Sequence, residues 1–331
     1  MKASNLAALL QAFFTDRLLT QRQASPHTVA GYRDCFRLLL RFAAQRLHKE
    51  PSKLALSDLD APFVGCFLGH LETERHNGAR TRNVRLAAIH SFFRYVALSE
   101  PAHALLCQRV LAIPSKRHER AAVVYLEQDE VTALIAAPDL ATRIGRRDRA
   151  LLLVAAQTGL RVSELRALHW GDVALGDGAH VRCLGKGRKQ RCTPLRRDSV
   201  SALRAWRRET GGAPESPLFP NIRGGVLSRD AIERIVTRHA ENASRRCPSL
   251  QQKKVTPHTL RHSAAMALLQ NGVDASVIAL WLGHESVETT QMYLHADVRM
   301  KERALARTDP FTMKPGRFRP RDDLLAFLEG L

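Results

Sequence analysis

The chain has 331 residues, 45% of them hydrophobic, which excludes a wholly disordered chain and allows two domains with sizeable cores. Its 51 lysines and arginines exceed its 32 aspartates and glutamates, and the formal net charge is +19 at pH 7. This excess predicts a polyanionic partner, most simply nucleic acid, with a solvated basic surface as the alternative.

The cysteine spacing and the hydropathy of the chain indicate in which cellular compartment the protein is expected. The six cysteines form no CxxC pair and resemble neither a disulfide framework nor a zinc site, so we expect reduced thiols. The apolar stretch from Leu6 to Phe14 is short and is interrupted by Gln11, which is typical of an amphipathic helix and not of a signal peptide. No run approaches membrane-spanning length. A soluble, cytoplasmic protein without membrane contacts is expected.

Residues 1–113 carry helical patterns throughout and are expected to form an all-helical domain. Ser25 followed by Pro26 is a typical helix start, and apolar residues recur after it at helical spacing. A second helix is predicted over residues 81–98, with Val84 on its apolar side and Arg82 off that side. Basic outer faces on such helices would suit a DNA clamp. A helical bundle with merely solvated arginines explains the pattern equally well.

A proline-led, charged stretch over residues 114–123 predicts a basic interdomain linker. Residues 124–308 are then expected to form a second domain. Its strands are predicted as a hairpin over residues 179–195, with a glycine-lysine turn at its tip. The fold class is therefore mainly α with a small antiparallel β-sheet. Helices of this domain are predicted to begin near residue 127 and to span residues 147–157, 196–208, 228–242 and 258–270, the last of them capped by Thr256-Pro257.

Tyr293 lies in a polar, helix-like segment, nine residues after the turn Leu282-Gly283-His284. A buried core tyrosine is not expected in such a segment, so we predict a chemical role. A tyrosine hydroxyl can attack a phosphodiester and form a covalent phosphotyrosine that preserves the energy of the bond. Because the unperturbed pKa of tyrosine is ~10, this attack requires cations or a base nearby.

Cationic residues elsewhere in the chain could supply that environment. Arg161 and Arg261 could each donate two hydrogen bonds to phosphate oxygens. His258 precedes Arg261 by three residues, so one helix face would present both. His284 could hydrogen-bond the phosphate or relay a proton. Lys186, at the predicted hairpin tip, could protonate the leaving 5′ oxygen.

Simpler readings exist for these residues. Arg161 could be a surface cation, and Gly185-Lys186-Gly187 could be an ordinary turn, since no phosphate-binding loop follows. His258 and His262 have the spacing of a metal-binding pair on a helix, but Thr259 stands where a zinc protease would carry glutamate and no third ligand is evident. We therefore predict no metal and no cofactor. The three tryptophans and the three other tyrosines are expected to be packing residues.

Four segments together resemble the boxes of the tyrosine recombinases, the phage-integrase and Xer-type family. The resemblance covers roughly residues 5–305 and extends to the order, spacing and identity of the motifs. It implies a helical core-binding, SAM-like domain at 1–113 and an α+β catalytic domain, closing on DNA as a C-shaped clamp. The boxes are residues 158–165 (TGLRVSEL), 185–189 (GKGRK), 258–262 (HTLRH) and 282–284 (LGH) followed by Tyr293.

The resemblance implies a role for each residue of the boxes. Lys189 is a rival to Lys186 for the lysine role, and Glu164 would either orient the first arginine or be an ordinary surface carboxylate. The implied reaction leaves a 3′-phosphotyrosine and a free 5′ hydroxyl, and passes through a Holliday junction without ATP or metal. The implied pocket consists of Arg161, Lys186, His258, Arg261 and His284, with Tyr293 as nucleophile.

The implied partners are double-stranded DNA recombination sites and a homo-tetramer, or a hetero-tetramer with related recombinases. Residues 309–331 are expected to form a tail that docks on a neighbouring protomer, with packing on its own domain as the alternative. The length of this tail favours a mobile-element enzyme for integration, excision or transposition. Xer-type resolution of chromosome or plasmid dimers, a type IB topoisomerase and a catalytically silent DNA-binding regulator remain alternatives.

Overall fold

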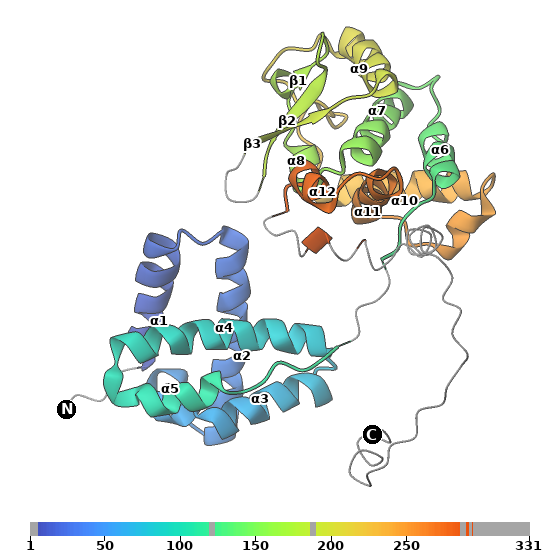
Figure 1. Cartoon of the computed structure of the whole chain (residues 1–331). Coiled ribbons are helices and arrows are strands. Elements are labelled where there is room, and N and C mark those ends of the chain that lie inside the picture. The colour runs from blue at the N-terminus through green and yellow to red at the C-terminus, as the bar shows by residue number, and fades with distance from the viewer. Residues whose placement is uncertain (1–5, 119–122, 186–189, 285–288, 291–292, 294–331) are drawn as a thin grey trace, which may run out of the picture. The chain divides into compact units, whose positions relative to one another are not determined.

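The computed structural model describes residues 6–118, 123–185, 190–284, 289, 290 and 293. The chain divides into two units, Met1–Ala121 (unit 1) and Ala122–Leu331 (unit 2), and each is described by itself (Figure 1). Within the described part of the chain, no helix has the length and apolar character needed to cross a membrane.

Among the described residues of unit 1 the elements are all helices, as its patterns predict. Ser25 caps the longest helix, because its hydroxyl accepts a hydrogen bond from the backbone N–H of Thr28 at 3.2 Å. The core is rich in aromatic rings: Phe13 lies edge-on to Phe36 and Phe92, with ring centroids 6.2 and 5.5 Å away. The main helices are α1 (Leu6–Ala12), which continues into the π-helix η1 (Phe13–Gln21), then α2 (Pro26–Leu47), α3 (Ala61–Thr73), α4 (Ala79–Ser99) and α5 (Ala104–Leu111).

The predicted apolar side of α4 is wrong at two positions. Val84 is 61% exposed, whereas Arg82 is only 7% exposed. Arg82 lies on the same helix face as the buried Leu86, four residues later, so it belongs to the buried stripe. Its guanidinium donates to the carbonyl of Pro114 at 3.2 Å and lies 3.8 Å from a carboxylate oxygen of Glu72, which compensates the charge.

The first residues of the predicted linker are bound to α4. The side-chain amide of Asn83 donates to the carbonyl of Lys116 at 2.8 Å, and its oxygen accepts from the N–H of Lys116 at 3.0 Å. The Lys116 ammonium reaches Glu72 at 2.8 Å. Residues 114–116 therefore belong to unit 1 by their contacts.

Unit 2 combines helices with one small sheet, which confirms the predicted fold class. Strands β1 (Val173–Ala174), β2 (His180–Leu184) and β3 (Gln190–Pro194) form an antiparallel sheet in the order β1-β2-β3. The predicted hairpin is β2–β3, in which Cys183 pairs with Arg191. The helices are α6 (Gln128–Ala136), α7 (Arg143–Thr158), α8 (Val162–Arg166), α9 (Arg197–Thr210), α10 (Arg229–Ser244), α11 (Pro257–Gln270) and α12 (Ala275–Leu282).

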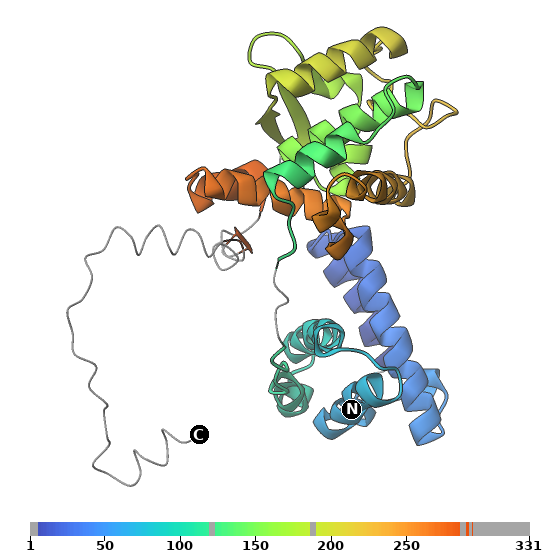
Figure 2. The same ribbon diagram turned by 90° about the vertical axis from the view of Figure 1, so that its right-hand side faces the viewer.

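Helix α7 is central to unit 2. In both views it lies between α9 and α11 (Figures 1 and 2), and its residues Leu151, Leu152 and Val154 are fully buried. Trp170 and Trp206 are 4% and 2% exposed, which confirms the prediction that they are packing residues. The C-terminal end of α7 and the helices that contact it carry the candidate site.

Candidate active site

Five of the six predicted site residues lie in the described part of unit 2. Arg161, His258, Arg261, His284 and Tyr293 come from the turn before α8, from α11, and from the chain beyond α12. Lys186 and its rival Lys189 lie outside the described residues.

Arg161 is held at the start of α8 by Glu164. Its backbone N–H donates to one carboxylate oxygen of Glu164 at 2.8 Å, and its guanidinium donates to the other at 3.0 Å. A second guanidinium nitrogen donates to the carbonyl of Gly283 at 3.0 Å. The Arg161 side chain is 32% exposed, so these acceptors fix a guanidinium that is not fully enclosed by protein. Glu164 therefore orients this arginine and is not an ordinary surface carboxylate.

Arg261 is buried on α11 and bridges two turns. Its guanidinium donates to the carbonyl of Gly159 at 2.7 Å and to that of Leu282 at 2.8 Å. Burial, reinforced by the charge of Arg161, lowers the pKa of Arg261 to about 10. At neutral pH Arg261 is therefore charged, and Arg161 donates to the next carbonyl along the chain, that of Gly283, which favours binding of an anion between the two arginines.

The two turns that these arginines bridge require glycine. Gly159 ends α7 with φ 62°, and a Cβ there would lie 2.6 Å from a methyl group of Leu282. Gly283 ends α12 with φ 66°, and a Cβ there would lie 2.7 Å from the guanidinium of Arg191. A side chain at either position would be strained in the left-handed backbone conformation and would force the side chain that it meets to move.

The predicted histidine of α11 has a neighbour that contacts the tyrosine. His258 and His262 lie one helical turn apart, with ring centroids separated by 4.3 Å. His262 Nδ1 lies 2.9 Å from the hydroxyl oxygen of Tyr293, a hydrogen bond. Burial, followed by the charges of His258 and Arg261, lowers the pKa of His262 to about 4, so the ring is neutral at neutral pH and can accept the phenol proton.

Tyr293 is buried, and the prediction that it would not be is wrong. It is 1% exposed and packs with the apolar residues Met266 and Ile278 of α11 and α12. Burial raises the pKa of Tyr293, although the charges of Arg261 and Arg161 oppose this. The phenol is therefore protonated at neutral pH in this structure, and its hydroxyl is held by an imidazole.

His284 completes the cluster. Its ring lies nearly parallel to that of Tyr293, with centroids 6.3 Å apart, and its Nδ1 is 2.7 Å from the hydroxyl oxygen of Thr290. Burial, with the charges of Arg261 and Arg161, lowers the pKa of His284 to about 4. A neutral His284 can exchange a proton with a ligand but adds no charge of its own.

Two residues of the cluster were missed as site residues by the sequence reasoning. His262 stood out only as half of a metal-binding pair, yet it contacts Tyr293; no group of three or more potential metal ligands occurs among the described residues. Arg191 on β3 forms a bidentate ion pair with Glu164. No local sequence pattern marks Arg191, because its partner Glu164 lies 27 residues earlier in the chain.

The described cluster therefore joins a buried tyrosine to two guanidiniums and to neutral imidazoles. The charges of Arg261 and Arg161 act on the Tyr293 hydroxyl, while the anionic Glu164 is already bound by Arg161 and Arg191. Such a site suits stabilisation of negative charge on a phosphate that the tyrosine attacks.

Comparisons with known proteins agree with this chemistry. The phage integrase family matches residues 124–300, and the N-terminal SAM-like domain of phage integrases matches residues 12–99. These two ranges fall in unit 2 and unit 1, respectively.

Relatives extend over nearly the whole chain. A putative integrase/recombinase of Sinorhizobium fredii, y4rC, is 54% identical over 330 residues, which is 100% of this chain and 99% of the relative. A tyrosine recombinase XerC of Pelobacter propionicus is 35% identical over 292 residues, covering 86% of this chain and 90% of its own.

A solved structure shares the fold. The site-specific recombinase XerH, bound to a palindromic difH substrate in a post-cleavage complex, superimposes with a TM-score of 0.70 at 23% identity, covering 86% of this chain and 81% of XerH. The chain belongs to the phage integrase family of tyrosine recombinases, enzymes that cut and rejoin DNA strands.

Proposed function

We propose that the chain is a site-specific recombinase of a mobile element, which joins DNA covalently to Tyr293. The observation that carries the proposal is that Arg161 and Arg261 converge on the turns at Gly159 and Gly283, while the Tyr293 hydroxyl is bound by His262, the residue after Arg261. Two arginines fixed by main-chain carbonyls can receive a phosphate without reorganising.

The proposed cleavage step exchanges one phosphodiester for another. The Tyr293 oxygen forms a bond to phosphorus as the bond from phosphorus to the 5′ oxygen breaks, leaving a 3′-phosphotyrosine. Arg161 and Arg261 stabilise the charge on the non-bridging oxygens, with His258 and His284 as further hydrogen-bonding partners. Lys186 supplies the proton to the 5′ oxygen. The free 5′ hydroxyl then attacks the phosphotyrosine of a partner strand, and repetition on the second strands resolves a Holliday junction.

Double-stranded recombination sites and a tetramer are the proposed partners. The net charge of +19 supports a DNA partner, and unit 1 and unit 2 would close around the duplex as a clamp. The tetramer would be formed by this chain alone or together with related recombinases.

A trapping experiment tests the nucleophile. Duplexes that bind the Tyr293→Phe protein are selected from a random-sequence pool, and the selected site is rebuilt with a nick that releases the cleaved 5′ fragment. The wild-type protein should accumulate a covalent adduct that survives denaturing electrophoresis. Tyr293→Phe should bind the same duplex equally well and form no adduct; an adduct with this variant would refute the assignment.

The mobile-element role is supported by the near full-length match to y4rC, which is named an integrase/recombinase. Dimer resolution in the manner of XerC is the second candidate, and the match over 86% of the chain favours it. A supercoiled plasmid with two selected sites flanking a marker distinguishes recombination from relaxation. Excision of the marker supports a recombinase, whereas relaxation of a plasmid without the site would indicate a type IB topoisomerase.

Residues 309–331, outside the described residues, are proposed to dock on a neighbouring protomer. Their last ten residues read DDLLAFLEGL, an amphipathic helical pattern. A cavity of about 1110 Å³ on unit 2, lined by Val131, Ile135, Leu268 and Trp281 among others, could receive such a helix. Deletion of residues 321–331 should weaken pairing of two sites and spare binding to one. Normal recombination by the truncated protein would contradict this docking.

A further inference from the structure

Glu164 is shared by two arginines, of which the proposed mechanism uses only Arg161. Arg191 donates to one carboxylate oxygen of Glu164 at 3.0 Å and to the other at 2.7 Å, a bidentate pair. Arg161 donates to the same carboxylate through its side chain and its backbone. The Glu164 side chain is 4% exposed, so this arrangement is enclosed by protein.

The two arginines differ in what they offer to a ligand. The Arg191 side chain is 11% exposed, against 32% for Arg161. Each of the three guanidinium nitrogens of Arg191 donates to a protein acceptor, since its Nε also reaches the carbonyl of Trp281 at 3.1 Å. Arg191 is thus directed at other residues of the site and not at the space beside Tyr293.

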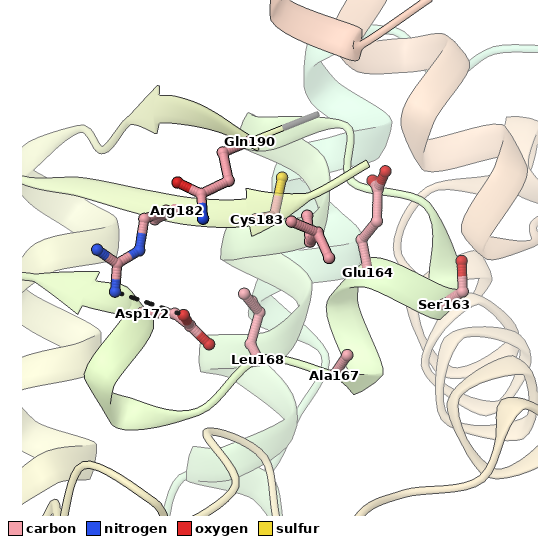
Figure 3. Close-up of a pocket in the computed structure, with 9 residues that line it drawn as sticks. Ser163, Glu164, Ala167, Leu168, Asp172, Arg182, Cys183 and Gln190 are labelled. Atoms are coloured by element: carbon pink, nitrogen blue, oxygen red, sulfur yellow. Dashed lines mark ion pairs between the residues drawn. The ribbon is translucent and has the colours of Figure 1, made fainter. Parts of the chain in front are cut away.

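Arg191 connects three elements that carry site residues. It lies on β3, one residue after the start of that strand at Gln190, and so follows the predicted lysine turn. Figure 3 shows Gln190 and Glu164 on facing elements of unit 2, the hairpin and α8, around a pocket of about 220 Å³. The contact with the carbonyl of Trp281 links the hairpin to α12, and the guanidinium also packs against Gly283.

Both groups of the ion pair are charged at neutral pH. Burial acts to raise the pKa of Glu164, but hydrogen bonds from Arg191 and Arg161 outweigh it and lower that pKa. Burial acts to lower the pKa of Arg191, and Glu164 outweighs it and raises that pKa. The pair therefore persists across the pH range in which the protein would act.

We propose that Arg191 is a positioning residue for strand cleavage: by clamping Glu164 and the end of α12, it aligns Arg161 with the scissile phosphate. The proposal rests on the proposed function and deepens it. Arg161 is attached to Glu164 at one side and to the carbonyl of Gly283 at the other. Arg191 binds Glu164 directly and, through the carbonyl of Trp281, holds the end of α12 next to Gly283. Its loss would let Arg161 shift relative to Tyr293 while leaving every group of the mechanism present.

The test measures single-turnover adduct formation on the selected nicked site at saturating DNA. Arg191→Met keeps the length of the side chain and removes its donors. We expect the rate to fall about 10- to 100-fold, the scale typical of residues that orient a reacting group, while the dissociation constant for DNA changes less than about threefold. Arg208→Met, an exposed arginine of α9, is the matched control and should react as the wild type does.

A double-mutant cycle separates positioning from a general loss of structure. Because Arg191 acts through Glu164, the variant Arg191→Met/Glu164→Gln should be no slower than the slower single variant. The double variant also leaves neither partner of the pair charged. It should therefore fold even if a single variant, with one unpaired buried charge, does not. Rate losses that multiply would overturn the proposal. Arg191→Lys retains charge but cannot bridge both carboxylate oxygens, and it should react at an intermediate rate.

A substrate with sulfur in place of the 5′ bridging oxygen identifies which part of the site fails. A thiolate leaves without protonation, so this substrate rescues a defect in the leaving-group acid. Arg191→Met should not be rescued; full rescue would place the defect in the lysine hairpin and overturn the route through Arg161. Wild-type rates in Arg191→Met refute the positioning role alone, whereas adduct formation by Tyr293→Phe refutes the proposed function.

Discussion

Among the buried carboxylates of unit 2, Asp148 on α7 and Glu164 on α8 are each shared by several cationic or titratable groups. Asp148 is fully buried, with its partners Arg147 at 2.7 Å, Arg238 at 2.7 Å and His239 at 2.9 Å. Glu164 is bound by Arg161 and Arg191. The chemistry of the two clusters is nearly the same.

The clusters differ in the other groups to which the cationic partners of each carboxylate donate hydrogen bonds. Arg147 donates to the carbonyl of Pro220 at 2.9 Å, so the Asp148 cluster ties α7 and α10 to a loop. The partners of Glu164 donate to the carbonyls of Trp281 and Gly283, within the three residues before His284. A buried carboxylate therefore stabilises the fold in one place and orders the candidate active site in the other. The residue type alone does not distinguish the two roles.

Replacing Asp148 should produce the largest change in stability. Asp148→Asn leaves the buried Arg147 without its anion, which we expect to lower the free energy of unfolding by about 3–5 kcal/mol. Denaturant unfolding measures the loss. The cleavage rate per folded molecule should be unchanged. A lower rate for this variant would show that Asp148, like Glu164, contributes to the active site.

Replacing Glu164 should cost less stability than replacing Asp148 and should slow cleavage. Glu164→Gln retains one acceptor for Arg161 and loses the bidentate pair with Arg191, so we expect about 1–3 kcal/mol of destabilisation. Adduct formation should fall about 10- to 100-fold. Equal rates for this variant and for wild type, measured at saturating DNA, would show that the Glu164 cluster is only structural.

Acidification should act on the site cluster through its histidines. Burial lowers the pKa of both His262 and His284 to about 4. The unfolded chain therefore binds more protons than the folded protein between about pH 6.5 and 4. Stability should be constant above pH 6.5 and should fall as the pH decreases through this window. Melting temperatures between pH 7.5 and 5 measure how steeply stability depends on pH. This dependence should be shallower for His262→Asn, and an unchanged dependence would show that His262 does not contribute to it.

The smallest effect is expected at the rim of the Asp148 cluster. The Arg238 side chain is 54% exposed, so its contact with Asp148 is well screened by solvent. Arg238→Met should change the free energy of unfolding by less than about 1 kcal/mol. A loss as large as that of Asp148→Asn would mean that Arg238 is an essential member of the buried network.

Local patterns predicted much of the fold. Helix starts such as Ser25-Pro26 and Thr256-Pro257 are encoded by neighbouring residues, and the hairpin by alternation around a glycine turn. The four motif segments also predicted that Arg161, His258, Arg261 and His284 belong to the same site as Tyr293. These features depend on short-range chemistry, which a single sequence displays.

The remaining features depend on what other segments contribute. Arg82 is buried because Pro114 and Glu72 supply partners from elsewhere in unit 1. Tyr293 is buried because α11 and α12 turn apolar faces toward it, which the polar residues around it do not reveal. Arg191 is paired because β3 passes beside α8, a tertiary contact without a local signal.

The acceptors that hold Arg161 and Arg261 are carbonyl oxygens of the main chain, at Gly159, Leu282 and Gly283. A point mutation replaces a side chain and leaves the peptide carbonyl in place, so sequence drift cannot delete these acceptors directly. Mutations that weaken the arginine pair are expected instead at Gly159 and Gly283, where any side chain would be strained in the left-handed backbone conformation and would meet a neighbouring side chain. Descendants of this gene can therefore vary the surface around the site widely while inheriting the same anion-binding geometry.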